Sequence, residues 1–224
     1  MQSLVGRRRA ASRERGFTLL EILVALTLMG VILLTAFATF NATFMAYLKG
    51  RDFTDEQQNA RFLLEWMVRR IRVAGLSVRY APNVTPAAFT QAGLTSVAFV
   101  GDADGDGTVR WYRYCLDTGS GVVRQQREDV PNPIPLVLPP PAGFSSCATG
   151  APLTSSGMRS LRVVSLGFRY FRGDGNELPA PVSGATNLAN IARVRITLGL
   201  DTNRSTLYEG AVDLTFVMNA VVRD

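Results

Sequence analysis

The chain has 224 residues, 47% of them hydrophobic, and its 24 basic side chains against 18 acidic ones give a formal net charge of +6. This composition excludes a fully disordered chain, a collagen and a polytopic membrane protein. The sequence contains no histidine, which excludes catalytic sites that need an imidazole base and metal sites that use histidine ligands.

The positive charge is concentrated at the N-terminus. Residues 1–16 contain five arginines and one glutamate, a net charge of +4, which leaves +2 for the other residues. Residues 17–40 then form an apolar run with no proline and one charge, at Glu21. About 20 apolar residues span a bilayer as a helix. The arginines before the run predict a cytoplasmic N-terminus, with the rest of the chain on the far side of the membrane.

The length of this apolar run and the charge at Glu21 help to decide between a cleaved signal peptide and a membrane anchor. A cleaved secretory signal peptide does not fit, because the run is too long and no small-residue cleavage site follows it. An ordinary membrane anchor fits the length but does not account for Glu21, because an unpaired carboxylate in such a run costs about 2.5–3.5 kcal/mol. We therefore expect a functional role for Glu21, with a partner outside the run.

The stretch RGFTLLE at residues 15–21 resembles the class III signal of type IV pilins and of type II secretion pseudopilins. The resemblance implies that residues 1–16 are a leader, that a prepilin peptidase cleaves between Gly16 and Phe17, and that Phe17 becomes N-methylated. It also implies that Glu21 pairs with the N-terminal amine of a neighbouring subunit, so that residues 17–40 serve as both membrane anchor and assembly helix.

Helical signals continue through residues 41–75. This segment contains no proline, and Gly75 is a plausible stop. Apolar residues recur at helical spacing near its end, which predicts one helix over residues 17–74 with an amphipathic second half: Phe62, Leu63, Trp66, Met67 and Ile71. Residues 62–76, with RIRVAG at 70–75, are also similar to the W-type (PilW-like) minor pilins.

Residues 76–224 are expected to form a β-rich globular domain. We predict a loop over 76–95, strands over 96–100, 108–116, 122–127, 161–171, 192–200 and 211–221, and a loop-rich stretch over 128–160 with a short apolar run at 134–138. Residues 173–177 are expected to form a hairpin turn. A long helix packed on a C-terminal antiparallel sheet is an α+β fold, which agrees with the pilin resemblance.

The acidic sequence between the first two predicted strands has two interpretations. Asp102, Asp104 and Asp106 match the first half of a D-x-D-x-D-G calcium loop, in which alternating carboxylates converge on one cation. However, Arg113 stands where an EF-hand has its bidentate glutamate, and the flanks are predicted strands. The alternative is a solvated hairpin turn, since Asp and Gly are turn residues. Calcium is the single cofactor that the sequence suggests.

Cys115 and Cys147 are the only cysteines. A location outside the cytoplasm favours a disulfide between them, closing a loop of about 30 residues and contributing roughly 3–4 kcal/mol. Two free thiols are the alternative.

The sequence gives little support for an enzyme, because Rossmann and P-loop glycine patterns are absent and no base occurs in a recognised arrangement. Residues 110–114, RWYRY, alternate arginine with aromatic residues. Such a stretch can stack on single-stranded DNA, although it more often indicates a strand with one buried aromatic face.

The resemblance implies a non-enzymatic minor pilin that helps to initiate or cap a type IV pilus. Its expected partners are the prepilin peptidase, other major and minor pilins, and an assembly platform in the bacterial inner membrane. The expected topology is a single pass with a periplasmic C-terminal domain, followed by incorporation into the filament. The function would then be twitching motility, adhesion or DNA uptake. One alternative is a J-type minor pseudopilin of a type II secretion system; another is a membrane-anchored calcium- or DNA-binding module.

Overall fold

A computed structural model describes residues 16–79, 87–130, 144, 146–153, 163–200 and 214–222. Its first element is helix α1, Leu19–Ile71. The chain divides into two compact units, one up to Arg51 and one from Asp52 onward, so α1 contributes to both.

The first unit consists of the N-terminal part of α1. Thr18 caps the helix, because its Oγ1 accepts a hydrogen bond from the backbone N–H of Glu21 at 3.3 Å and its carbonyl accepts from the N–H of Ile22 at 3.2 Å. The threonine hydroxyls inside the apolar run bond back to carbonyls of the same helix, for example Thr27 to Val24 at 2.8 Å. These threonine hydroxyls are therefore satisfied within the helix, as a bilayer requires of polar groups.

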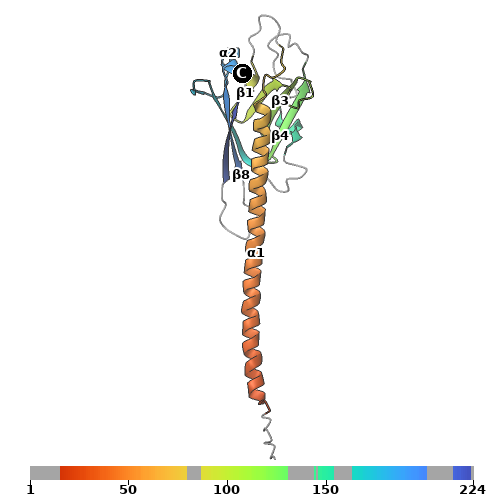
Figure 1. The fold of residues 1–224 in the computed structure, drawn as a ribbon, viewed down its shortest axis with the longest axis vertical. Coiled ribbons are helices and arrows are strands. Elements are labelled where there is room, and N and C mark those ends of the chain that lie inside the picture. The colour runs from red at the N-terminus through yellow and green to blue at the C-terminus, as the bar shows by residue number, and fades with distance from the viewer. Residues whose placement is uncertain are drawn as a thin grey trace, which may run out of the picture. The chain divides into compact units, whose positions relative to one another are not determined.

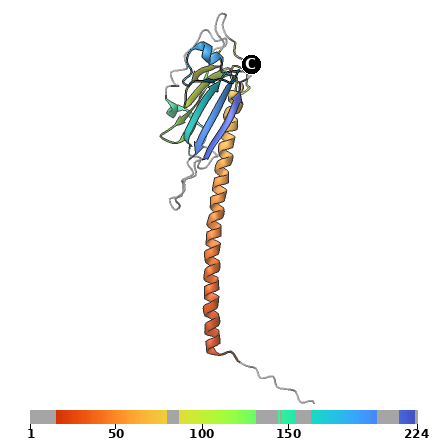
Figure 2. The same cartoon turned by 90° about the vertical axis from the view of Figure 1, so that its left-hand side faces the viewer.

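The second unit contains two antiparallel sheets (Figures 1 and 2). The first sheet has the order β1-β2-β3-β4-β5, with β1 Phe89–Ala92, β2 Ser96–Gly101, β3 Arg110–Asp117, β4 Val122–Asp129 and β5 Ala151–Pro152. The second has the order β7-β6-β8-β9, with β6 Val163–Phe171, β7 Glu177–Leu178, β8 Arg193–Leu200 and β9 Leu214–Val221. A short helix α2, Ala185–Ala189, and a 3-10 turn η2, Cys147–Thr149, complete the described elements.

The main core lies between both sheets and the second half of α1. The helix contributes one buried stripe at helical spacing, made of Ala60, Leu63, Leu64, Met67, Val68 and Ile71. Alternate residues of β8 face the same core, and Val194, Ile196 and Leu198 are fully buried. Because helix and sheets share this core, the second half of α1 is part of the β-rich domain.

The end of α1 is fixed by contact with β2. Gly75 adopts φ +82°, a conformation that favours glycine, and its N–H donates to the carbonyl of Val100 at 2.7 Å. Gly101 permits this close approach, because a Cβ there would lie 2.8 Å from the carbonyl oxygen of Val73. The predicted stop at Gly75 is thus part of the turn that joins the helix to the sheet, while the helix itself ends at Ile71.

The predicted α+β architecture of a long helix with antiparallel strands is confirmed. The strands form two sheets rather than one, because β6, β8 and β9 pair with one another and not with β4. The short elements β1, η2 and β5 lie where loops were predicted, β7 begins at the last residue of the predicted turn 173–177, and α2 lies where no element was predicted. The apolar run 134–138, residues 161–162 and residues 201–213 lie outside the described residues.

Candidate functional site

The N-terminal motif lies at the start of α1. Gly16, Phe17 and Thr18 precede the helix, and Glu21 stands in its first turn. Phe17 is 79% exposed, and no ion pair of Glu21 occurs within the described residues. The motif therefore presents an apolar residue and, four positions later, a carboxylate available to another molecule.

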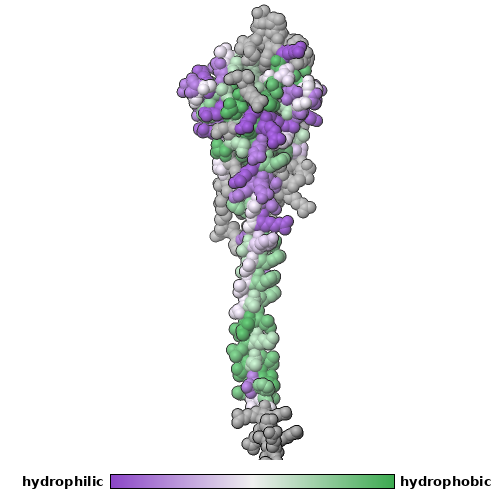
Figure 3. All heavy atoms as spheres, viewed as in Figure 1, coloured by the Kyte–Doolittle hydropathy of each residue, from purple (hydrophilic) through white to green (hydrophobic). Residues whose placement is uncertain are grey.

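The helix that follows the motif has an almost entirely apolar surface. By length and composition alone, α1 could cross a membrane. Figure 3 shows hydrophobic residues along most of its N-terminal half. The exposed large side chains include Leu23, Leu26, Ile32, Leu34 and Phe37. A patch of this extent marks a surface made for lipid or for other apolar helices.

The acidic loop between β2 and β3 is organised by Asp102. Its two carboxylate oxygens accept hydrogen bonds from the backbone N–H groups of Gly105 at 2.8 Å, Asp106 at 3.1 Å and Gly107 at 3.0 Å. Asp106 instead accepts from the N–H of Thr108 at 2.9 Å and pairs with Arg110 at 2.8 Å. These interactions, the Thr108 bond foremost, lower the pKa of Asp106.

Asp104 points inward and joins the loop to α1. It pairs with Arg70 at 2.7 Å and more loosely with Arg110 at 3.4 Å and Arg127 at 3.6 Å, and it accepts a hydrogen bond from the Tyr112 hydroxyl at 2.9 Å. The Arg70 guanidinium also lies 3.9 Å from the centre of the Trp66 ring, an attractive cation–π geometry. We call Asp104, Arg70, Arg110, Arg127 and Tyr112 the Asp104 cluster.

These contacts do not fit the hypothesis that Asp102, Asp104 and Asp106 form a calcium loop. The three carboxylates are engaged by backbone N–H groups and by arginines, with Arg110 shared between Asp104 and Asp106. Among the described residues, no group of three acidic or cysteine side chains is placed to hold a metal ion. The solvated-turn interpretation is also incomplete, because Asp104 is only 18% exposed and pairs with arginines. Asp104 in the loop and Arg70 on the helix are 34 positions apart in sequence, so no local pattern predicted their pairing.

Residues 110–114 have the buried aromatic face that was expected, and Trp111 is buried on the opposite face of β3 as well, so the rings of this stretch are not a platform for DNA bases. Tyr112 and Tyr114 are fully buried in the main core. Trp111 is 7% exposed and belongs to a second apolar cluster on the other face, with Ala98, Val100, Val109, Val130 and Phe144. Base stacking needs an exposed ring.

A disulfide joins Cys115, in the second half of β3, to Cys147, the first residue of η2, with their Cα atoms 6.0 Å apart. It attaches the segment before β5 to the first sheet. The 3-10 turn is also held by Ser146, whose Oγ accepts from the N–H of Ala148 at 3.3 Å.

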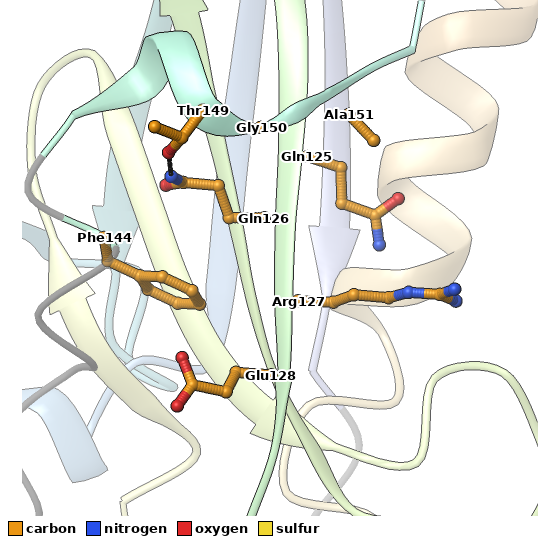
Figure 4. Close-up of a pocket in the computed structure, with 8 residues that line it drawn as sticks. All are labelled: Gln125, Gln126, Arg127, Glu128, Phe144, Thr149, Gly150 and Ala151. Atoms are coloured by element: carbon orange, nitrogen blue, oxygen red, sulfur yellow. Dashed lines mark hydrogen bonds between the residues drawn. The ribbon is translucent and has the colours of Figure 1, made fainter.

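A cleft of about 270 Å³ lies beside β4 and η2 (Figure 4). In the close-up, Gln126 and Glu128 project to one side of β4 and Gln125 and Arg127 to the other. The Gln126 amide donates to the Thr149 hydroxyl at 2.8 Å and to the Ser146 carbonyl at 2.7 Å. The cleft is thus lined by side chains that already hold the turn in place.

On the neighbouring strand β3, Arg113 lies opposite Gln126 and is 9% exposed. It donates to the Gln126 side-chain oxygen at 3.0 Å and to the Phe144 carbonyl. Burial lowers the pKa of Arg113. Both of these acceptors are neutral oxygens, and through them Arg113 links β3 to β4 and to Phe144.

Comparison with known proteins bears on the N-terminal motif. Residues 11–37 match the model of the prokaryotic N-terminal methylation motif. Among solved structures, a type IV-like pilin from Thermus thermophilus is similar, with 12% identity, a TM-score of 0.47, and coverage of 74% of this chain and 94% of that one. No curated protein matches the sequence significantly. The motif match covers the end of the leader, the predicted cleavage position, Glu21 and most of the apolar run. The N-terminal segment of this chain therefore carries the prokaryotic N-terminal methylation motif.

Proposed function

We propose that this protein is a minor pilin, a non-enzymatic subunit that helps to initiate or cap a type IV pilus. The observation that carries the proposal is the methylation motif at residues 11–37, together with the exposed surface of the helix over residues 19–40, in which Glu21 is the one charged residue. Such a helix must be covered by lipid before assembly and by neighbouring helices afterwards.

In this proposal, a prepilin peptidase cleaves between Gly16 and Phe17 and the new amine of Phe17 is methylated. Gly16 leaves room for the enzyme, since a side chain is absent there. Glu21 lies about one helical turn beyond Phe17. In a staggered stack of parallel helices, the Glu21 carboxylate of one subunit meets the ammonium group of the next. In an apolar bundle, loss of one partner of such a pair costs about 3–5 kcal/mol.

The proposed location follows from the same features. The arginines of residues 1–16 hold the N-terminus in the cytoplasm, α1 crosses the inner membrane once, and the β-rich domain lies in the periplasm before the subunit enters a filament. The disulfide between Cys115 and Cys147 supports an oxidising compartment for that domain. Other pilins and an inner-membrane platform are the proposed partners.

Substitution of Glu21 tests the assembly role. We expect Glu21→Ala to retain membrane insertion, because it removes the one charge of the apolar run, and to lose most incorporation into sheared filaments. Thr35→Ala is the matched control, because the Thr35 hydroxyl bonds within its own helix to Ile32 at 2.9 Å. Immunoblots of membrane and filament fractions give the readout. Equal incorporation of wild type and Glu21→Ala would contradict the proposal.

The W-type assignment rests on the similarity of residues 62–76 to W-type minor pilins, and the alternative is a J-type minor pseudopilin of a type II secretion system. A deletion strain separates the two: a pilus subunit affects surface filaments and twitching, adhesion or DNA uptake, whereas a pseudopilin affects the export of folded proteins. Complementation with the wild-type chain restores whichever activity is lost.

A further inference from the structure

Strand β9 is a long outer strand of the second sheet. It stands last in the order β7-β6-β8-β9 (Figure 2), and its eight residues, Leu214–Val221, pair with β8 in one unbroken register. In the part of the chain that the structure describes, no strand pairs with the other side of β9. The strand thus presents a long backbone edge to its surroundings.

The backbone groups on this edge belong to alternate residues. The Val222 N–H donates to the Ala192 carbonyl at 2.9 Å, and the same register continues along the whole of β9. Because the hydrogen-bonded pairs of an antiparallel ladder alternate, the even-numbered residues of β9 face β8. The N–H and C=O groups that face away from β8 are those of Thr215, Val217, Asn219 and Val221.

The other outer strands carry features that discourage the addition of a further strand. β5 and β7 have two residues each, and β5 ends at Pro152, which has no N–H to donate. β1 has a register shift between Phe89 and Gln91 and is bridged to Val182 at its end. Natural sheets protect their edges by short strands, proline, irregular pairing and charged side chains. The β9 sequence, LTFVMNAV, contains no charge and no proline.

The outer face beside this edge is apolar. Val217 and Val221 are 56% and 59% exposed, and Gly199 of β8, opposite Thr215, adds no side chain to the face. Residues directly opposite each other on paired strands have Cβ atoms about 4.5–5.5 Å apart. A strand added beside β9 would therefore cover both valines, provided that it carries apolar side chains at alternate positions.

We propose that the free edge of β9 binds an extended segment of another protein, which joins the second sheet as a further strand. Backbone hydrogen bonds to the odd-numbered residues supply the pairing, and alternate apolar side chains packed on Val217 and Val221 supply specificity. A lipid or a nucleic acid fits less well, because neither has the regularly repeating N–H and C=O groups that complete such an edge.

A second copy of this chain fits the edge less well than another protein does. Two copies that pair symmetrically through β9 form an antiparallel ladder. Figure 2 shows β9 running in the same general direction as the second half of α1, so the helices of the two copies would point in opposite directions. The N-terminal arginines favour one orientation in a membrane. This choice of partner rests on the proposed membrane anchor, whereas the free edge itself does not.

The test uses the full chain in neutral detergent micelles and a fluorescein-labelled peptide with the sequence of residues 193–200, RVRITLGL. This sequence is suitable because, as β8, it already forms an antiparallel ladder with β9 and alternates apolar with polar residues. Binding is measured by fluorescence anisotropy. A control peptide with Ile196→Pro and Thr197→Pro lacks one donor on either edge and should not bind.

Variants of β9 separate the edge from the rest of the face. Val217→Pro removes an outward N–H and no hydrogen bond to β8, as an outer strand tolerates, and should weaken peptide binding about tenfold. Val217→Lys adds the kind of charge that protects natural edges and should weaken binding as strongly. Val164→Lys is the matched control, because Val164 is 51% exposed on β6, which lies between β7 and β8, and should leave binding unchanged. Thermal unfolding close to that of wild type establishes that each variant folds.

Amide hydrogen exchange identifies the surface that the peptide covers. Bound peptide should slow exchange at the odd-numbered residues of β9 about tenfold, since their N–H groups become hydrogen-bonded. No binding, binding that the folded Val217 variants do not weaken, or binding without this protection would overturn the proposal. Concentration-dependent dimerisation of the full chain that Val217→Lys abolishes would replace the partner protein with a second copy.

Discussion

The Asp104 cluster makes a quantitative prediction about how the acidic loop stabilises the β-rich domain. Asp104 and its nearest partner Arg70 are 18% and 20% exposed, and their charged atoms are 2.7 Å apart. Exposed ion pairs contribute 0–1 kcal/mol, whereas removal of one partner of a buried pair costs about 3–5 kcal/mol. For this intermediate burial, we expect Asp104→Asn to lower the free energy of unfolding by about 2 kcal/mol.

Further substitutions separate the charge from the hydrogen bond. Asn keeps an oxygen that accepts from the Tyr112 hydroxyl, so Asp104→Ala should cost about 1 kcal/mol more. Asp129→Asn is the control, because Asp129 also pairs with Arg110, at 2.7 Å, but is 76% exposed and should contribute less than about 1 kcal/mol. A double-mutant cycle with Arg70→Met should give a coupling energy above about 1 kcal/mol.

The assay is thermal unfolding of the full chain in detergent, followed by far-UV circular dichroism. A domain of this size changes its Tm by about 2–4 °C per kcal/mol, so Asp104→Asn should lower Tm by about 4–8 °C. Equal Tm values for Asp104→Asn and Asp129→Asn would refute the reasoning. So would a rise in Tm with millimolar calcium that Asp104→Asn abolishes, because the arginines would then not be the true partners of Asp104.

Two further predictions concern the same domain. Replacement of both Cys115 and Cys147 by serine should destabilise it by about 3–4 kcal/mol, given a separation of 32 residues. A reductant should lower the wild-type Tm to the value of that variant, and a Tm unaffected by reductant would contradict this. The pKa of Asp106 is lowered by the Thr108 N–H and by Arg110, and the pKa of Asp117 by the Ser120 hydroxyl and by Arg124. A lowered native pKa gives stability that is present above the unfolded value of about 4 and is lost as the pH falls through the native pKa. Tm should therefore fall steeply only below about pH 4, and less steeply in Asp117→Asn; an equal slope in the two proteins would count against the Asp117 contacts.

Sequence patterns predicted the elements whose signals are long and local. The helix needs only a proline-free run with an apolar stripe, and the β8 strand needs only alternation such as Val194, Ile196 and Leu198, which are indeed buried. The short strands β1 and β7 were missed because two to four residues carry too little pattern. Their pairing partners, β2 and β6, supply the hydrogen bonds that define them.

The sequence by itself determined the N-terminal signal, because the leader, Gly16, Phe17 and Glu21 follow one another at fixed spacing within a single segment. Only the tertiary structure determined the contacts and the burial of the charged and aromatic residues elsewhere. Asp104 meets Arg70 because a loop folds back on α1, and Trp111 is buried because Val130 and Phe144 cover the second face of β3. The arginines of β6 and β8 likewise become one face only through strand register. Such contacts join residues far apart in the chain, so no local pattern encodes them.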